Sequence, residues 1–506
     1  MRLLCVNSVF TQDNLTKYID ENLESIMTVR KITAIGFMLF AIFFGAGNLI
    51  FPPNAGWLSG GNFFPAIIGF VITGVGLPLL GIIAGSFSEE GFITETKRIG
   101  VIFSVVFMVA IYLTIGPFFA IPRTATVSYE MALVPFIRNE GGLLHGLFLS
   151  IAEGLKSMFY AADASVLATD LVGKVGLFFY SVFFFIVVFW LSFNPTKIVD
   201  RVGQILTPAL LITMLVLIVL AIFQLNTPIE AVDPSYQAAP FAKGFVEGYQ
   251  TMDTIAAVAF SIIVLKAVRA YGITNQKDLF KYSSYAAVIA GIALGLIYIA
   301  LGWVGNHFPI DEAQFALQQQ DRGTYILTQV SRMTLGLPGQ FLLGIIVGLA
   351  CLTTAIGLIV SISSYFHSLM PRLSYKQYAI IFTLISFGLA NQGLSSIIKG
   401  AIPVLLIVYP LTITLIVLIF IDKLLVPLDK VELRITTYVV LFISVSSVFF
   451  PTAGFVQMLP LHDISMGWVV PGVVAFLVAI HINNNILLKR AVRNQNKEHK
   501  IAQIVE

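Results

Sequence analysis

The sequence predicts an all-α polytopic membrane protein with about twelve transmembrane helices, and three observations lead to this fold class. Of the 506 residues, 57% are hydrophobic and only 11% are charged, whereas a soluble domain carries about 25% charged residues. Apolar runs of about 20 residues, the length that crosses a bilayer as a helix, recur along the chain. Two of these runs, one in each half, are interrupted at mid-span by glycine and polar residues. Nearly all of the chain is therefore expected to lie in the lipid bilayer.

The twelve expected spans follow one another with mostly short connections. They lie near residues 32–57, 63–86, 100–127, 175–193, 203–224, 243–266, 282–305, 339–368, 376–391, 396–421, 434–452 and 466–488. Two sizeable pieces are expected outside the membrane, at 128–174 and at 306–338. The first is expected on the external side, with short re-entrant or amphipathic stretches of its own.

The two ends of the chain do not fit the pattern of spans. Residues 1–29 are polar, and their short apolar start is too brief for a signal sequence. Because Met27 closely precedes the first span, residues 1–26 are interpreted either as an extension that is not translated or as a cytoplasmic tail. Residues 491–506 form a second polar tail. Neither end is expected to carry the function.

The lysines and arginines indicate how the spans are oriented. An even number of spans places both termini on one side, and most of the 30 lysines and arginines fall on that side. The exceptions are Arg123, Arg138, Lys156, Lys174, Lys243, Arg322, Arg332 and Lys399. Since basic residues concentrate in cytoplasmic loops, both termini are expected in the cytoplasm. The net charge of +3 is small and gives no reason to expect a nucleic-acid partner.

The first span contains an interruption that a simple membrane anchor would not have. Residues 45–48 read Gly-Ala-Gly-Asn, and two prolines follow within the same span. Irregular backbone at membrane depth is tolerated only where it is buried in protein or lines a cavity. Discontinuous helices of this kind form substrate sites near the bilayer midplane in secondary transporters. The first span is therefore predicted to be a broken helix at a binding site.

The sixth span repeats this feature with a carboxylate. Asp253 lies ten residues after Lys243 and thirteen before Lys266, close to the middle of the span. A carboxylate at that depth costs about 2.5–3.5 kcal/mol on insertion scales, so it requires a partner, a proton or a water-filled cavity. We interpret it as part of a substrate or ion site. The alternative is that the span begins later and the segment forms an outer mouth.

The spacing of the two interruptions predicts an internal repeat. The second broken span comes five spans after the first, and an odd number of helices per repeat inverts the second copy. We expect inverted repeats over residues 30–242 and 243–422, with the last two spans at 423–490. Half-helix N-termini suit a carboxylate, and half-helix C-termini and unwound carbonyls suit a cation. One site can therefore hold an amino acid and a coupling ion together.

The eighth span contains a further cluster of hydroxyl residues. Thr353 and Thr354 are adjacent within an otherwise apolar stretch, followed by serines a few residues later. Hydroxyl oxygens can bind a small cation. Membrane threonines also commonly donate to the carbonyls of their own helix, and the residues alone do not decide between the two roles.

Two segments resemble the signatures of a known family. These are Gly36 to Pro53, with Phe-Phe-Gly-Ala-Gly-Asn-Leu-Ile-Phe-Pro-Pro at its end, and Glu247-Gly-Tyr-Gln-Thr-Met-Asp-Thr. Together with the twelve spans they are similar to the bacterial branched-chain amino acid:cation symporters over residues 30 to 490. The resemblance implies import of leucine, isoleucine and valine across the bacterial cell membrane, coupled to Na⁺ or in some members to H⁺, with no other cofactor. It also implies a leucine-transporter-like fold of two inverted five-helix repeats plus two C-terminal helices.

The resemblance also implies roles for single residues. The implied substrate-binding residues are Gly45, Ala46, Gly47, Asn48, Tyr249, Thr251, Met252, Asp253 and Thr254. The implied sodium ligands are Ala41, Phe44, Ala350, Thr353 and Thr354, the alanines and the phenylalanine through their carbonyls. Amino-acid symporters of the leucine-transporter type place an outer-gate arginine soon after the asparagine of the first span. No arginine follows Asn48 here, so no gate residue is assigned.

Other classes of protein predict different patterns. A channel or passive facilitator would show a continuous polar stripe along several spans, whereas the polar residues here gather at mid-span. A membrane enzyme would need clustered acids, histidines or metal ligands, and the six histidines are scattered. The nearer rival is a carrier of the same fold for another amino acid or a nucleobase. The chain is expected to be no enzyme, and no obligatory protein partner is evident.

Overall fold

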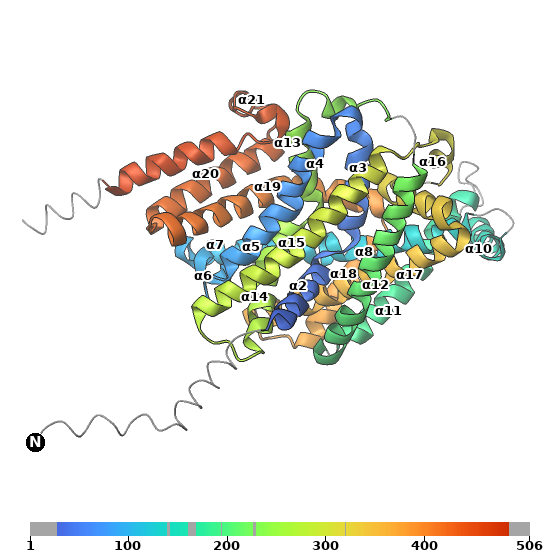
Figure 1. The fold of residues 1–506 in the computed structure, drawn as a ribbon, viewed down its shortest axis with the longest axis horizontal. Helices are drawn as coiled ribbons and strands as arrows, with labels where there is room; N and C mark the ends of the chain where they lie inside the picture. The colour runs from blue at the N-terminus through green and yellow to red at the C-terminus, as the bar shows by residue number, and fades with distance from the viewer. Residues whose placement is uncertain are drawn as a thin grey trace, which may run out of the picture.

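The computed structural model describes most of the chain, and every regular element among the described residues is a helix. The described ranges are 28–138, 142–159, 168–193, 195–225, 229–318 and 320–484. The predicted extension before residue 27 and the predicted tail at 491–506 lie outside these ranges. Figure 1 shows the helices gathered in one bundle, with α10 at its edge.

The helices of the first half cover the first five expected spans. In chain order they are α2 (Val29–Phe43), α3 (Ala46–Ser59), η1 (Gly60–Asn62), α4 (Phe63–Val71), η2 (Ile72–Gly76), α5 (Leu77–Gly85), α6 (Phe92–Ile99), α7 (Val101–Leu113), η3 (Thr114–Phe118), α8 (Ala120–Ala132), α9 (Val134–Ile137), α10 (Leu143–Phe159), α11 (Ala168–Ser192) and α12 (Pro195–Gln224). The elements η2 and η3 are π-helical turns inside the second and third spans.

The helices of the second half cover the remaining spans. They are η4 (Pro234–Tyr236), α13 (Pro240–Glu247), η5 (Gly248–Thr251), α14 (Asp253–Arg269), α15 (Gln276–Asn306), α16 (Glu312–Gln318), α17 (Arg322–Leu369), α18 (Tyr375–Ala390), α19 (Leu394–Phe420), η6 (Ile421–Leu425), α20 (Lys430–Phe449), α21 (Gly454–Gln457) and η7 (His462–Ile464). The last described helix is Val469–Asn484.

The membrane character predicted from composition agrees with these helices. Among the described residues, seven helices are long and apolar enough to cross a membrane, or eight if the bent pair Pro240–Thr251 and Asp253–Arg269 counts as one span. The other expected spans coincide with shorter helices, such as α18 and Val469–Asn484. The fold class is thus that of a multi-span helical membrane protein.

The segment 128–174, expected as a long external loop, is partly helical. The helix α8 continues the third span as far as Ala132. The short α9, the 17-residue α10 and the start of α11 follow within the same segment. Tyr129 in this region is buried, and it donates its hydroxyl hydrogen to the Gly173 carbonyl at 2.7 Å. The start of the segment is thus packed inside the protein.

The segment 306–338, also expected as a loop, contains α16 and the first part of α17. The long helix α17 breaks at Gly336, whose φ is +69°, two residues before Pro338. Its first part packs against α8, and the Thr324 hydroxyl donates to Glu130 Oε2 at 2.6 Å. Both side chains are buried. In the sequence, polar residues of this kind suggested a loop, because their buried partners cannot be seen there.

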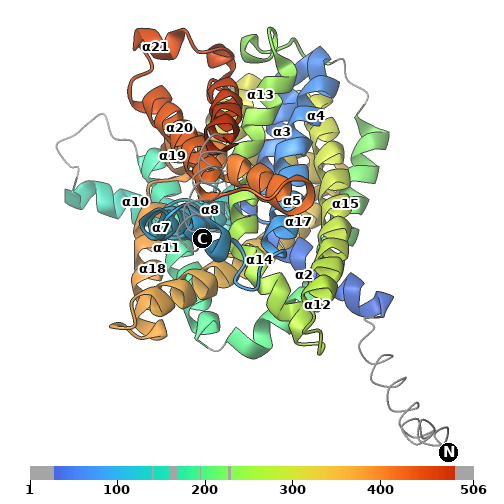
Figure 2. The same cartoon turned by 90° about the vertical axis from the view of Figure 1, so that its left-hand side faces the viewer.

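The two broken spans run in opposite directions through the bundle. The halves α2 and α14 lie in the lower part of Figure 1, and α3 and α13 lie in the upper part, an arrangement that Figure 2 also shows. Each broken span packs against the helix that follows the other one. The half α3 contacts α15 and α13 contacts α4, while α2 contacts α15 and α14 contacts α5. This exchange of partners is what two inverted repeats require.

Glycines allow the closest of these helix contacts. A Cβ on Gly56 of α3 would lie 1.9 Å from the Gly302 carbonyl oxygen of α15. A Cβ on Gly244 of α13 would lie 1.9 Å from the Ala66 carbonyl oxygen of α4. Small residues let membrane helices approach this closely. The two contacts hold α3 and α13 against the opposite repeat.

Substituting Gly56 with alanine is expected to destabilise the protein, because the added methyl group overlaps the Gly302 carbonyl. Overpacking of this kind typically costs about 1–3 kcal/mol. The measurement is the Tm of the detergent-solubilised protein. The matched control is Gly357→Ala, where no atom lies within 4 Å of the added Cβ. Equal Tm values for both variants would contradict this packing.

A polar cluster fastens the C-terminal helices to the first repeat. The Arg98 guanidinium of α6 donates to both carboxylate oxygens of Asp422, at 2.6 and 3.1 Å, and to the Leu428 carbonyl at 2.6 Å. Arg98 also pairs with Glu95 at 2.9 Å. Burial alone would raise the pKa of Glu95, but hydrogen bonds from Ser88 and Arg98 outweigh burial and hold this pKa below its ordinary value. The Glu95 carboxyl group is therefore ionised at neutral pH.

Candidate binding site

The glycine-rich segment of the first span breaks the helix at the predicted residues. The helix α2 ends at Phe43, and α3 begins at Ala46. Phe44 has φ −71° and ψ 89°, and Gly45 has φ −124° and ψ −158°, so neither is helical and Gly45 is extended. The Gly45 N–H donates to Asn48 Oδ1 at 3.0 Å, which caps the new helix. The N-terminus of α3 therefore begins in the interior of the bundle.

The sixth span breaks just before its carboxylate. After α13 and the 3₁₀ turn η5, Met252 adopts the left-handed conformation with φ +65°, and α14 starts at Asp253. The two halves meet at an angle of 45°. A left-handed residue other than glycine costs roughly 1–3 kcal/mol and is frequent at functional sites. The break places the Asp253 carboxylate at the N-terminus of a half-helix, where negative charge is favoured.

Hydrogen bonds join the two breaks directly. Asn48 Nδ2 donates to Asp253 Oδ2 at 2.7 Å and also contacts the Tyr298 hydroxyl. The Tyr298 hydroxyl of α15 donates to the same carboxylate oxygen at 2.6 Å. All three side chains are buried. Asn48 thus uses its oxygen to cap α3 and its amide group to hold the carboxylate of the other repeat.

A buried arginine from α8 lies against the same two breaks. Arg123 is 3% exposed, and its guanidinium donates to the Gln250 carbonyl at 2.6 Å and to the Thr251 carbonyl at 3.3 Å. It lies 5.2 Å from the centre of the Phe51 ring. A Cβ on Gly47 would come within 2.7 Å of Arg123 Nη2. Glycine at this position therefore gives the guanidinium its place beside the start of α3.

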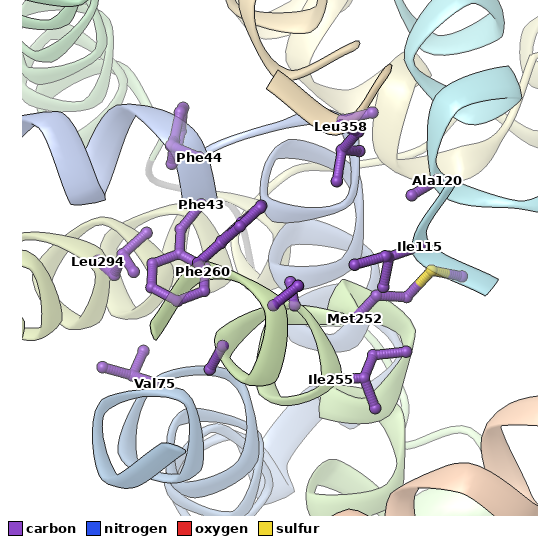
Figure 3. Close-up of a cluster of buried hydrophobic side chains, with 14 of the residues drawn as sticks. Phe43, Phe44, Val75, Ile115, Ala120, Met252, Ile255, Phe260, Leu294 and Leu358 are labelled. Carbon is purple, nitrogen blue, oxygen red and sulfur yellow. The ribbon is translucent and has the colours of Figure 1, made fainter. Parts of the chain in front are cut away.

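These residues enclose a small cavity of about 30 Å³, enough for a water molecule or two. Much of its wall is apolar, with Ile115 from η3, Leu358 from α17, and Met252 and Phe260 from the sixth span among the lining residues, all labelled in Figure 3. The Phe43 and Phe260 rings pack edge to face at 5.4 Å on one side. The remaining lining residues are Ile42, Gly45, Ala46, Gly47, Asn48, Ala120, Arg123, Thr124, Thr251, Asp253, Ala256 and Thr354.

The structure gathers most of the substrate-binding residues named from the sequence. Gly45, Ala46, Gly47, Asn48, Thr251, Met252 and Asp253 all line the cavity. Two do not. Tyr249 stacks on Tyr409 with ring centres 4.2 Å apart, and the Thr254 hydroxyl donates to the Thr73 carbonyl at 2.9 Å. These two residues pack behind the break of the sixth span and connect it to α19 and η2.

The residues named as sodium ligands divide in the same way. Thr354 lines the cavity, and its hydroxyl is buried without a hydrogen-bond partner among the described residues. A Cβ on Gly45 would lie 3.1 Å from the Thr354 hydroxyl oxygen. The Thr353 hydroxyl instead donates to the Ala350 carbonyl at 2.8 Å, the back-bonded arrangement. The residues outside the cavity wall are Ala41, Phe44, Ala350 and Thr353.

Reasoning from the sequence missed Arg123. It was assigned to the external side because it lies near the end of the third expected span. The available signal was an arginine within an apolar run, since an ionisable residue inside the membrane is by default a candidate functional residue. Its contacts at the sixth-span break come from 127 residues away in the chain.

Comparison with known proteins identifies a matching family and similar relatives. The family described as branched-chain amino acid transport protein matches residues 28–175 and 157–486. A branched-chain amino acid carrier protein of Staphylococcus aureus (strain MRSA252) is 43% identical over 466 residues, which cover 89% of this chain and 97% of the relative. A protein of the same description from Staphylococcus saprophyticus is 43% identical over 459 residues, covering 88% and 95%.

Solved structures with a similar fold are transporters. MhsT in complex with L-phenylalanine has a TM-score of 0.52 at 19% sequence identity, covering 88% of this chain and 98% of that one. The nucleobase-cation-symport-1 family transporter Mhp1, in a closed conformation with bromovinylhydantoin bound, has a TM-score of 0.56 at 12% identity, covering 90% and 93%. At these identities the likeness establishes the fold alone. It confirms the leucine-transporter-like architecture predicted from the sequence.

Proposed function

The chain belongs to the branched-chain amino acid transport protein family, and from this membership we propose that it imports leucine, isoleucine and valine by symport with a cation. The observation that carries the proposal is the cavity between the two broken helices. It joins an apolar wall to the N-termini of α3 and α14 and to the Asp253 carboxylate. The site lies in the bacterial cell membrane, with both termini in the cytoplasm.

The cavity wall supports a branched-chain substrate. Ile115, Met252 and Phe260 offer an aliphatic side chain only apolar contacts. One methylene in such a pocket is worth only about 1–3 kcal/mol, so leucine, isoleucine and valine are separated poorly. Lysine and glutamate are rejected because Ile115, Met252 and Phe260 offer no partner for a charged side chain, and burying an unpaired charge is costly.

The coupling ion has two candidate places. For Na⁺, the Thr354 hydroxyl beside Gly45 supplies one oxygen, since it has no hydrogen-bond partner in the described part of the chain. The Ala41, Phe44, Ala350 and Thr353 oxygens are the further proposed ligands. For H⁺, the Asp253 carboxyl carries the proton. A cation that crosses about 100 mV contributes roughly 2.3 kcal/mol. That energy supports about 40-fold accumulation of substrate, at about 1.4 kcal/mol per tenfold.

Transport requires the site to open to each side in turn. At about 30 Å³ the cavity is too small for a leucine side chain, so the helices around it must separate for binding. The non-helical residues at 44–45 and at 252 are where the broken spans can bend. We propose that the first two helices of each repeat rock against the remaining helices.

Thr354→Ala is expected to raise the sodium concentration needed for half-maximal uptake about tenfold, because one buried oxygen ligand is worth roughly 1–2 kcal/mol. Thr354→Ser keeps the hydroxyl and is expected to stay close to the wild type. Thr353→Ala is expected to have a smaller effect, since that hydroxyl bonds to its own helix. The measurement is leucine uptake against sodium concentration. An unchanged sodium dependence in Thr354→Ala would remove this residue from the ion site.

The proposal as a whole is tested by uptake of labelled leucine into proteoliposomes with an inward Na⁺ gradient, an equal H⁺ gradient or none. We expect accumulation that depends on one of the two gradients and is competed by isoleucine and valine but not by lysine. Proton-driven accumulation would assign coupling to Asp253. Equilibration without accumulation would contradict symport and favour a facilitator.

A further inference from the structure

Two side chains of opposite charge type face the binding cavity without a direct ion pair between them. Arg123 and Asp253 both line it, and both are at most 3% exposed. Within the described residues, no ion pair of 4 Å or less joins them. A buried ionisable group that makes no direct ion pair recovers little of its desolvation cost. A zwitterion placed between the two groups would neutralise both at once.

The Arg123 guanidinium retains N–H groups that could bind a further acceptor. Arginine has five N–H donors, and two bonds to the Gln250 and Thr251 carbonyls are present. The Arg123 Nε–H is buried and has no hydrogen-bond partner among the described residues. A buried donor left unpaired costs free energy that a bound acceptor would recover. The guanidinium is therefore held in place and still able to bind an anion.

The backbone N–H groups at the start of α3 are not all available to a carboxylate. The family resemblance implied that residues 45–48 bind the substrate. The Gly45 N–H, however, already donates to Asn48 Oδ1. The guanidinium lies against Gly47, close enough that a Cβ there would collide with Nη2. One carboxylate can therefore contact both the start of α3 and the guanidinium, which forms stronger hydrogen bonds than a neutral N–H.

We propose that Arg123 binds the α-carboxylate of the substrate while Asp253 binds its α-ammonium group. The pair makes the cavity selective for zwitterionic α-amino acids, and the apolar wall selects the side chain. This inference rests on the proposed function and assigns to Arg123 a binding role in it. It predicts that an analogue without the carboxylate loses the contribution of Arg123 to binding. An analogue without the ammonium group loses the contribution of Asp253.

The test compares leucine with leucinamide, which lacks the carboxylate, in binding to the wild type and to Arg123→Gln. We measure displacement of labelled leucine, or direct binding where affinity is low, on purified full-length protein. Leucine affinity is expected to fall about 10- to 100-fold in Arg123→Gln, the range for losing hydrogen bonds to a charged group. Leucinamide affinity is expected to change little, because it never used the guanidinium.

Two further variants make the comparison specific. Arg322→Gln removes an arginine that stacks on Trp57 at 4.2 Å outside the cavity wall, and it is expected to keep the wild-type ratio of leucine to leucinamide affinity. Arg123→Lys keeps the charge but loses the planar fork. It is expected to retain a preference for leucine over leucinamide, and it replaces Arg123→Gln if that variant fails to fold.

The outcomes separate the inference from the function it rests on. If Arg123 only supports the sixth-span break, leucine and leucinamide lose affinity by the same factor, and the inference is overturned. An unchanged leucine affinity in Arg123→Gln overturns it as well. A wild-type protein that binds no leucine overturns the proposed function itself.

Discussion

Asp253→Asn is expected to reduce leucine uptake at least about 100-fold, because the ammonium group of the bound substrate would lose its proposed counter-charge. The asparagine oxygen can still accept the bonds that Asn48 and Tyr298 donate to Asp253 Oδ2. The local structure is therefore expected to persist while the negative charge is lost. Without that charge the site can neither hold a substrate ammonium nor carry a coupling proton.

The measurement for Asp253→Asn is initial uptake rate in proteoliposomes, with Tm recorded on the same preparation. The control is Asp278→Asn in the first turn of α15, where the carboxylate accepts a bond from Asn275 at the surface. That variant is expected to transport like the wild type. Near-normal uptake by Asp253→Asn would show that the buried carboxylate takes no part in transport.

Asn48→Ala is expected to produce the second large effect, a loss of uptake of about 100-fold or more. The substitution removes the acceptor for the Gly45 N–H and the donor to Asp253. Each buried group left unsatisfied costs about 1–3 kcal/mol, and here both losses fall on the two breaks that form the site. The half-saturating leucine concentration and the maximal rate are both expected to worsen.

The matched control for Asn48→Ala is Asn306→Ala. Asn306 is also a buried asparagine, and its amide group donates to the Gly56 and Gly60 carbonyls at 2.9 Å. It lies outside the cavity wall. Its loss is expected to lower Tm while leaving the half-saturating leucine concentration nearly unchanged. Equal effects of the two variants on leucine affinity would mean that Asn48 acts only through stability.

The sequence predicted the broken helices well because the signals are local. Glycine and asparagine in an apolar run, and an aspartate at mid-span, are improbable unless they serve a site, and the breaks occur at Gly45 and Met252. The fold class followed from the same features. Which hydroxyl of the pair Thr353 and Thr354 faces the cavity depends on the rotation of α17, and the spacing of residues in the sequence does not fix it.

The arginine of the site could not be placed in the same way. Arg123 lies eight residues beyond Ile115 in the same span, and both line the cavity, with a π-helical turn and a non-helical Gly116 in this part of the span. Its partners are backbone carbonyls of the sixth span, which carry no residue-type signal. Contacts to backbone from a distant helix require the assembled structure.

The most direct measurement is a structure of the protein determined with leucine and sodium. We expect leucine between the two breaks, with its carboxylate at Arg123 and the start of α3, its ammonium group at Asp253, and its side chain against Ile115 and Phe260. A leucine molecule bound elsewhere, or one turned so that its carboxylate points away from both Arg123 and α3, would contradict the proposed site.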